Sequence, residues 1–206
     1  MNERVVADFV GEFYLSGMDR DGPVRGRIVM SPKRLVLVGE SGRETIPTTS
    51  VFDVAVGQVP PEMRAFFSDS VTVAYEVDDT RRLAIVEAGA DTIEKFTDVL
   101  FKAQLNGREV TVEHPARRGG RVVDTAARPA RLTVDDRRLA FGGPEVDFDV
   151  DLATVTSFER GTRTLDGRSR PALVVHHVPR TTTLVSIVAL PSGRAMNILG
   201  RYLRLE

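Results

Sequence analysis

The sequence has no cysteine and no tryptophan, and aromatic residues make up only 6% of its 206 positions. Without thiols, the chain can form neither disulfides nor cysteine-based zinc sites, and thiolate chemistry is excluded. No apolar run approaches the roughly 20 residues that are needed to span a bilayer. The opening residues, MNERVVADFV, also lack the apolar core of a secretory leader. We therefore expect a protein of the cytosol with no integral membrane segment.

Net charge is also nearly absent, because 28 Lys and Arg residues are balanced by 29 Asp and Glu residues. A net charge of −1 gives the molecule no overall field that would steer it onto nucleic acid or an anionic membrane. We therefore expect no nucleic-acid partner. The apolar and charged contents, 42% and 28%, are those of an ordinary globular protein.

The strongest positive feature is an internal repeat. Gly26–Val38 predicts a strand, a Ser-Pro-Lys turn and a second strand that is apolar on both faces. A shift of 104 residues, from Arg34 to Arg138, aligns this hairpin with a second copy at Arg131–Phe141. A self-match at a fixed period is strong evidence for a duplicated architecture. We predict two domains, 1–107 and 108–206.

In the first domain, short strands rich in β-branched residues are expected beside this hairpin, at Val5–Leu15, Arg43–Pro47, Val51–Val56, Val71–Val77 and Arg82–Ala88. Val59–Ser70 interrupts the pattern with two prolines, which favour a short turn of helix. An amphipathic helix is expected from Asp91 to Asn106-Gly107, a pair that tolerates the positive φ of a helix stop.

The second domain repeats this plan, with strands expected at Glu109–His114, Arg131–Val134, Arg138–Phe141, Val146–Val150, Val155–Glu159, Leu173–Val178 and Thr183–Ala189. Pro115–Gly120 is expected to be a loop. A last helix follows Ser192 and repeats the apolar spacing of the first helix. No glycine or proline stops it, so we expect it to run to Glu206, in a chain cut from a longer protein.

Short antiparallel strands followed by one amphipathic helix favour a curled sheet whose open end the helix covers. We therefore predict a mainly β fold of two tandem pleckstrin-homology (PH)-like, partly open β-barrels, each closed by a C-terminal α-helix. The first hairpin resembles the GRAM and bacterial PH-like pattern at Gly26, Arg34-Leu35-Val36-Leu37 and Ile46-Pro47.

Longer stretches resemble the archaeal taxis adaptor family CheF: VVADFVGEF, GRIVMSPKRLVLVGESGRETIPTTSVFDV, EVTVEHPARRGGRVV and ARLTVDDRRLAF. The resemblance implies a non-enzymatic adaptor that binds the response regulator CheY, with a preference for its phosphorylated form. It further implies coupling of CheY to the accessory proteins of the archaellum motor, with CheD and CheC as further partners. The matching motifs are structural, so no contact residue is carried over from the family.

No group of residues predicts catalysis or a bound cofactor. Of the three histidines, His114, His176 and His177, the adjacent pair should point to opposite faces of a strand and so cannot share a metal ion. Carboxylates at Asp78-Asp79 and Asp135-Asp136 suit hairpin turns. The alternating Asp147, Asp149 and Asp151 suit the solvated face of a strand. Nucleotide-binding loops, nucleophile elbows and zincin helices are missing.

Two features are candidate protein contacts. Arg117, Arg118 and Arg121 crowd one segment and could hold an anion, or could simply be solvated. Phe66-Phe67 follows two prolines in an excursion that the second domain lacks. These rings could anchor a partner, or they could plug the open end of the barrel.

Three hypotheses follow from these observations. The first is the adaptor. The second is a PH- or GRAM-type module that binds lipid at a membrane surface, motivated by the three arginines. The third is a hydrolase, which requires His176 or His177 to lie within hydrogen-bond distance of a carboxylate in a deep pocket.

Overall fold

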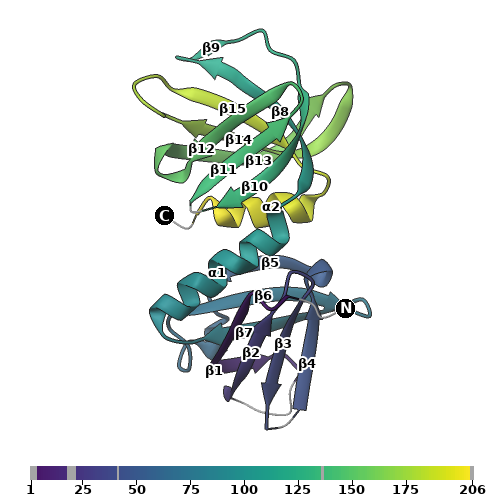
Figure 1. The fold of residues 1–206 in the computed structure, drawn as a ribbon, viewed down its shortest axis with the longest axis vertical. Coiled ribbons are helices and arrows are strands. Elements are labelled where there is room, and N and C mark those ends of the chain that lie inside the picture. The colour runs from purple at the N-terminus through teal and green to yellow at the C-terminus, as the bar shows by residue number, and fades with distance from the viewer. Residues whose placement is uncertain (1–3, 18–21, 41, 136, 205–206) are drawn as a thin grey trace. The chain divides into compact units, whose positions relative to one another are not determined.

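The computed structural model describes residues 4–17, 22–40, 42–135 and 137–204. The chain divides into two compact units, Met1–Gln104 and Leu105–Glu206. Each unit contains an antiparallel sheet and a helix that packs against that sheet (Figure 1). The domain limits expected from the sequence, 1–107 and 108–206, stay a prediction.

Unit 1 contains one seven-stranded sheet with the spatial order β4-β3-β2-β1-β7-β6-β5. Its strands are β1 (Ala7–Leu15), β2 (Val24–Met30), β3 (Arg34–Gly39), β4 (Gly42–Pro47), β5 (Val51–Val56), β6 (Ser70–Val77) and β7 (Thr80–Glu87). The unit also contains helix α1 (Ala90–Leu105) and the single turns of 3₁₀ helix η1 (Thr48–Ser50) and η2 (Pro61–Met63).

Unit 2 has the corresponding order, β12-β11-β10-β8-β15-β14-β13, and a short strand β9 that pairs with β8 alone. Its strands are β8 (Arg108–Arg118), β9 (Arg121–Val122), β10 (Arg128–Asp135), β11 (Arg138–Gly143), β12 (Val146–Asp151), β13 (Val155–Leu165), β14 (Arg168–His177) and β15 (Leu184–Ala189). A 3₁₀ turn η3 (Leu152–Thr154) and helix α2 (Gly193–Tyr202) complete the unit.

The sequence repeat is reproduced in the structure. β3 and β4 begin 104 residues before β11 and β12, and η1 begins 104 residues before η3. Both units also carry an irregularity at the same place, between Val51 and Asp53 in β5 and between Val155 and Ser157 in β13. The prediction of a mainly β fold is therefore confirmed.

Since β4 and β5, and likewise β12 and β13, are the outer strands of their sheets, neither sheet closes into a barrel. The PH-like assignment stays a prediction.

The core of unit 1 lies between the sheet and α1. Leu35, Leu37 and Ile46 are buried on one face of β3 and β4, and Phe96 and Leu100 are the corresponding buried residues of α1. Burial of each such side chain contributes about 1.5–3 kcal/mol to folding. The apolar spacing that predicted α1 therefore marks the face of the helix that packs on the sheet.

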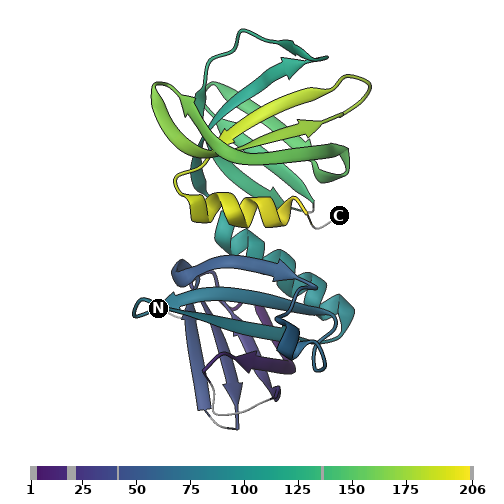
Figure 2. The same ribbon diagram turned by 180° about the vertical axis from the view of Figure 1, so that it is seen from behind.

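The core of unit 2 is formed in the same way by its sheet and α2 (Figures 1 and 2). Ile198 and Leu199 of α2 are fully buried, and Ser192 caps the helix by accepting a hydrogen bond from the backbone N–H of Ala195 at 3.2 Å. The helix ends at Tyr202, so the expectation that it runs to Glu206 is wrong.

Two stretches of unit 2 are more regular than expected. Strand β8 continues through Pro115 to Arg118, so the expected loop at Pro115–Gly120 is wrong. Pairing with β15 on one side and β9 on the other stabilises this extension. Strand β13 likewise continues to Leu165, and strand β14 already begins at Arg168. Asp166-Gly167 forms the turn between them, with φ of 51° and 70°. Asp-Gly is a strong hairpin signal because both residues tolerate positive φ.

Candidate functional site

The arginine-rich segment forms a β-hairpin. Arg117 and Arg118 end β8, Gly119-Gly120 make the turn with φ of 56° and 79°, and Arg121 begins β9. Glycine suits both turn positions, because a side chain there would be strained at positive φ. The three arginines are thus held in an ordered ladder.

Strand pairing separates the three arginines into two groups. Arg118 lies directly opposite Arg121, and Arg117 lies opposite Val122. Since successive residues of a strand point to opposite faces, Arg118 and Arg121 share one face of the hairpin. Arg117 and Val122, which is 77% exposed, share the other face.

The face of Arg118 and Arg121 is extended by the connection between β14 and β15. A hollow of about 450 Å³ is lined there by Arg118 and Leu184 together with Pro179, Arg180, Thr181 and Thr182. The backbone N–H of Gly119 donates a hydrogen bond of 2.8 Å to the carbonyl oxygen of Thr183, which ties the hairpin to this connection. Arg180 is therefore a fourth arginine of the region, which the sequence analysis missed. We call Arg118, Arg121 and Arg180 the arginine site.

The aromatic pair divides between core and surface. Phe67 is 4% exposed and packs with Met63 and Ile85, whereas Phe66 is 46% exposed. The excursion through η2 therefore covers part of the unit 1 sheet with Phe67 and leaves Phe66 in solvent. Phe67 is therefore a core residue of unit 1, and a partner contact at Phe66 stays a prediction.

Two histidines meet inside unit 2. Nδ1 of His114 lies 2.7 Å from the Ser186 hydroxyl oxygen, and Nε2 of His177 lies 3.0 Å from the same oxygen. The His114 ring also stacks on Phe148, with centroids 3.7 Å apart. We call His114, His177 and Ser186 the histidine cluster. Its formation was not predicted, because no local sequence pattern connects β8, β14 and β15.

Burial keeps the histidine cluster neutral. It lowers the pKa of His114 to about 4, with smaller contributions from His177 and Arg118. Burial, followed by the charge of His176, also lowers the pKa of His177. Desolvation disfavours the charged imidazolium, which explains the direction of both changes.

The histidine cluster does not have the geometry of a hydrolytic site. Ser186 is 1% exposed, so its hydroxyl cannot meet a substrate. In the part of the chain that the structure describes, no carboxylate hydrogen bonds to the two rings. His176 is on the other face of β14, as alternation requires. Among the described residues, no group of three or more His, Asp or Glu side chains could hold a metal ion.

The acidic residues have structural contacts. Asp78 and Asp79 occupy the turn between β6 and β7 with φ of 49° and 59°, as expected for a tight hairpin. In β12, Asp149 pairs with Arg138 at 3.2 Å, and Asp151 accepts a hydrogen bond from the N–H of Ala153 at the start of η3. Asp135 lies in β10, and Asp136 is outside the described residues.

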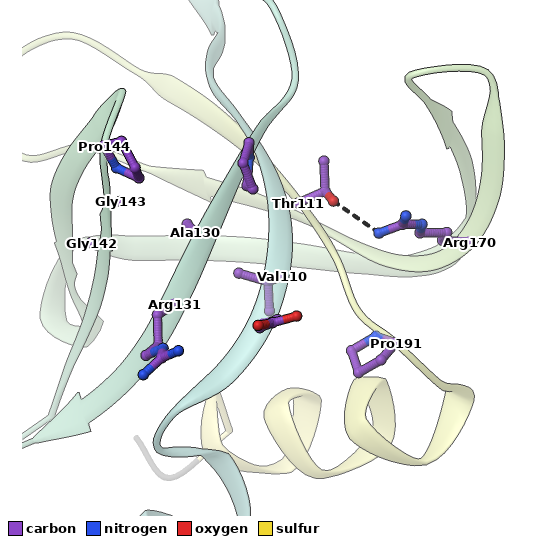
Figure 3. Close-up of a pocket in the computed structure, with 11 residues that line it drawn as sticks. Val110, Thr111, Ala130, Arg131, Gly142, Gly143, Pro144, Arg170 and Pro191 are labelled. Carbon is purple, nitrogen blue, oxygen red and sulfur yellow. Dashed lines mark hydrogen bonds between the residues drawn. The ribbon is translucent and has the colours of Figure 1, made fainter.

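A second hollow, of about 490 Å³, lies across β8, β10 and β11 (Figure 3). Arg170 reaches into it from β14 and donates a hydrogen bond of 2.9 Å to the Thr111 hydroxyl. Gly142 leaves room here, because no atom lies within 4 Å of where its Cβ would be. The Asp166-Gly167 signal could have placed Arg170 in a strand that pairs with β13, but its contact with β8 depends on the tertiary structure, because β15 lies between β8 and β14.

The comparisons with known proteins agree with one another. The family model for archaeal chemotaxis signal transduction system protein F matches residues 5–206. The chain belongs to this family. It is 41% identical to taxis protein CheF2 of Halobacterium salinarum over 206 residues, which cover the whole of this chain and 71% of the relative. Taxis protein CheF1 of the same organism is 29% identical, with the same coverage.

Membership of the CheF family assigns a role in archaeal taxis to the chain. Within the ranges that the structure describes, no helix is both long and apolar enough to span a bilayer.

Proposed function

We propose that this CheF-family chain is a non-enzymatic adaptor that binds the response regulator CheY, with a preference for its phosphorylated state. It couples CheY to the accessory proteins of the archaellum motor, with CheD and CheC as further partners. The observation that carries this proposal is the match to the archaeal chemotaxis family across residues 5–206. The likeness to two proteins named as taxis proteins supports the same role.

The proposed mechanism is recognition of a conformation. Phosphorylation shifts CheY between two states, and an adaptor responds only through its difference in affinity for them. A difference of about 1.4 kcal/mol gives tenfold discrimination. Ordered strands such as the β8–β9 hairpin suit this task, because little conformational entropy is lost when a preorganised surface binds.

The direct test is calorimetric titration of the chain with CheY from the same organism, with and without beryllofluoride as a phosphoryl mimic. We expect at least about tenfold tighter binding with the mimic. CheY whose phosphoacceptor aspartate is replaced by alanine is the control, and beryllofluoride should not change its affinity. Equal affinities for the two states of CheY, or no binding, would contradict the proposal.

The alternative function is a module that binds lipid at a membrane surface, and the arginine site is the observation that favours it. Flotation with anionic vesicles separates this alternative from the adaptor. Salt-sensitive flotation without any binding of CheY would favour the lipid module.

A further inference from the structure

The arginine site brings together positive charges that no nearby carboxylate of the described residues neutralises. Arg118 and Arg121 lie directly opposite each other on neighbouring strands, where like charges destabilise a sheet. Within the described part of the chain, neither of them nor Arg180 forms an ion pair or a side-chain hydrogen bond. Some other exposed arginines are paired, such as Arg27 with Asp8 and Arg138 with Asp149. An anion from outside the chain would offset the repulsion.

The site is shaped as well as charged. Arg118 and Arg180 line the hollow of about 450 Å³, with the hydroxyls of Thr181 and Thr182 beside them. Pro179 and Leu184 supply apolar surface in the same hollow. Guanidinium groups donate paired hydrogen bonds to carboxylates, and threonine hydroxyls donate one more each. This combination suits a short peptide segment whose carboxylates reach the arginines while its backbone or apolar atoms contact Leu184.

We propose that the arginine site docks a carboxylate-rich segment of a partner protein. This proposal deepens the adaptor function, on which it rests for the identity of the partner as CheY. A protein is favoured over a membrane because the positive charge of the site is confined to three side chains, of which Arg118 and Arg180 line one hollow. Stable attachment to a bilayer takes a wider basic patch or a second anchor. The net charge of −1 for the whole chain also provides no further attraction to an anionic surface.

The position of the site leaves it accessible within its own unit. β9 lies at the end of unit 2 that is opposite to α2, as both views show (Figures 1 and 2). Arg118, Arg121 and Arg180 are all exposed. Arg117 faces the other side of the hairpin with Val122, so the proposal excludes it from the site.

The test uses a charge-reversed variant, R118E/R121E/R180E, and a matched control, R25E/R43E/R168E, in which three exposed arginines elsewhere undergo the same change in charge. Fluorescently labelled octaglutamate is the first probe, measured by anisotropy at low salt. We expect the wild-type chain and the control to bind it in a salt-sensitive manner. The variant should bind at least about tenfold more weakly, because several charge-assisted hydrogen bonds are lost. Equal binding by variant and control would overturn the proposal.

Two single substitutions guard against misfolding of the triple variant. R180Q changes the connection between β14 and β15 without touching a strand, and it should weaken binding of octaglutamate by itself. R117E changes β8 on its other face and should leave binding near the wild-type level. A loss with R117E equal to the loss with R180Q would show that general charge, and not the arginine site, attracts the peptide.

A spectroscopic readout locates the bound peptide. The His114 ring lies close enough for Arg118 to influence its electrostatics, whereas His176 is on the opposite face of β14 from the histidine cluster. Octaglutamate should therefore shift the NMR resonances of the His114 ring more than those of His176. The reverse pattern would place the peptide elsewhere and contradict the proposal.

The last arm repeats the measurement with activated CheY and with vesicles of phosphatidylcholine and phosphatidylglycerol in equal amounts. If wild type binds CheY and the triple variant does not, both proposals stand. If wild type and the triple variant bind CheY equally, the adaptor function stands and the proposal that the arginine site docks CheY is wrong. If wild type binds octaglutamate but not CheY, the site stands and the choice of CheY fails. Arginine-dependent binding to vesicles, without binding to the peptide, would replace the protein partner by a membrane.

Discussion

The two units share their strand order and differ at one end of their cores. Phe13 of β1 pairs with Val86 of β7, and Val112 of β8 pairs with Val188 of β15 at the equivalent place in unit 2. When the strands are aligned on these two pairs, the three residues of the histidine cluster correspond to three residues of unit 1. His114 corresponds to Leu15, Ser186 to Ala84 and His177 to Tyr75. Unit 2 therefore carries a hydrogen-bonded polar group where the same fold in unit 1 is largely apolar.

This difference shows how one sheet tolerates opposite chemistries. Tyr75 keeps its ring in the core of unit 1, and burial, followed by the charge of Glu44, raises its pKa to about 12. In unit 2, the Ser186 hydroxyl lies within hydrogen-bond distance of one ring nitrogen of each histidine, whereas the buried Nδ1 of His177 has no hydrogen-bond partner among the described residues. Most buried polar groups in proteins are hydrogen bonded. The same strand pairing therefore accommodates an apolar group in unit 1 and a partly hydrogen-bonded polar group in unit 2.

The outer faces differ as well. Val10, Arg27 and Val38 lie side by side on β1, β2 and β3 of unit 1. The matching ladder of unit 2 is Glu109, Arg131 and Gly142, and the hollow of Figure 3 opens where glycine replaces valine. Duplication thus conserved the ladder while the surfaces diverged.

The largest difference in stability is expected when a large core side chain is truncated at equivalent positions of the two units. Phe141→Ala should destabilise unit 2 by about 3–5 kcal/mol, and Leu37→Ala should destabilise unit 1 by about 2–5 kcal/mol. Phe141 also loses its stacking on Phe148, whose ring centroid is 4.7 Å away. Hydrogen exchange of each unit measures the two losses separately. A loss that spreads equally over both units would show that they unfold as one.

A smaller effect is expected where the units differ by one methyl group. Gly26 in unit 1 corresponds to Ala130 in unit 2, at the shift of 104 residues. A Cβ on Gly26 would lie 2.1 Å from the Val38 carbonyl oxygen, so Gly26→Ala should cost about 1–3 kcal/mol. The free energy of unfolding, measured in urea, provides the test. Ala130→Gly is the control and should cost about 1 kcal/mol or less through lost strand propensity. Similar costs for both changes would refute the steric argument.

The smallest effect is a pH dependence confined to unit 2. The pKa of both histidines of the cluster is lowered in the folded chain, so the unfolded chain binds more protons as the pH falls below 6.5. Stability should be complete above pH 6.5 and should decline toward pH 4. Since His114 is partly exposed, we expect a loss of about 1–2 kcal/mol at pH 4.5, less than its pKa alone implies.

The control for this prediction exchanges the cluster for its counterpart. The variant H114L/S186A/H177Y gives unit 2 the residues of unit 1 and should remove this loss. Hydrogen exchange at pH 7 and pH 4.5 reports each unit. A decline of equal size in unit 1, or its persistence in the variant, would show that other groups titrate.

Much of the fold followed from local patterns. The hairpin at Arg34, the turn at Asp78-Asp79 and the face of α1 at Phe96 were all predictable, because turn chemistry and apolar spacing act over a few residues. The extension of β8 past Pro115 was not predicted, since pairing with β9 and β15 overrides the turn propensity of a Pro- and Gly-rich segment.

The candidate site was only half visible in the sequence. Arg118 and Arg121 are close along the chain and were found, but Arg180 is distant in sequence and joins them through the β14–β15 connection. Phe66 and Phe67 were grouped by adjacency, yet only Phe67 enters the core.

By itself, the sequence determined the duplication, the mainly β class and the family, because repeats, alternation and motifs are encoded along the chain. Only the tertiary structure decided that Arg117 and Arg118 face apart and that His114 meets His177. The physical reason is that sheet register brings distant strands together and alternation assigns each side chain to a face.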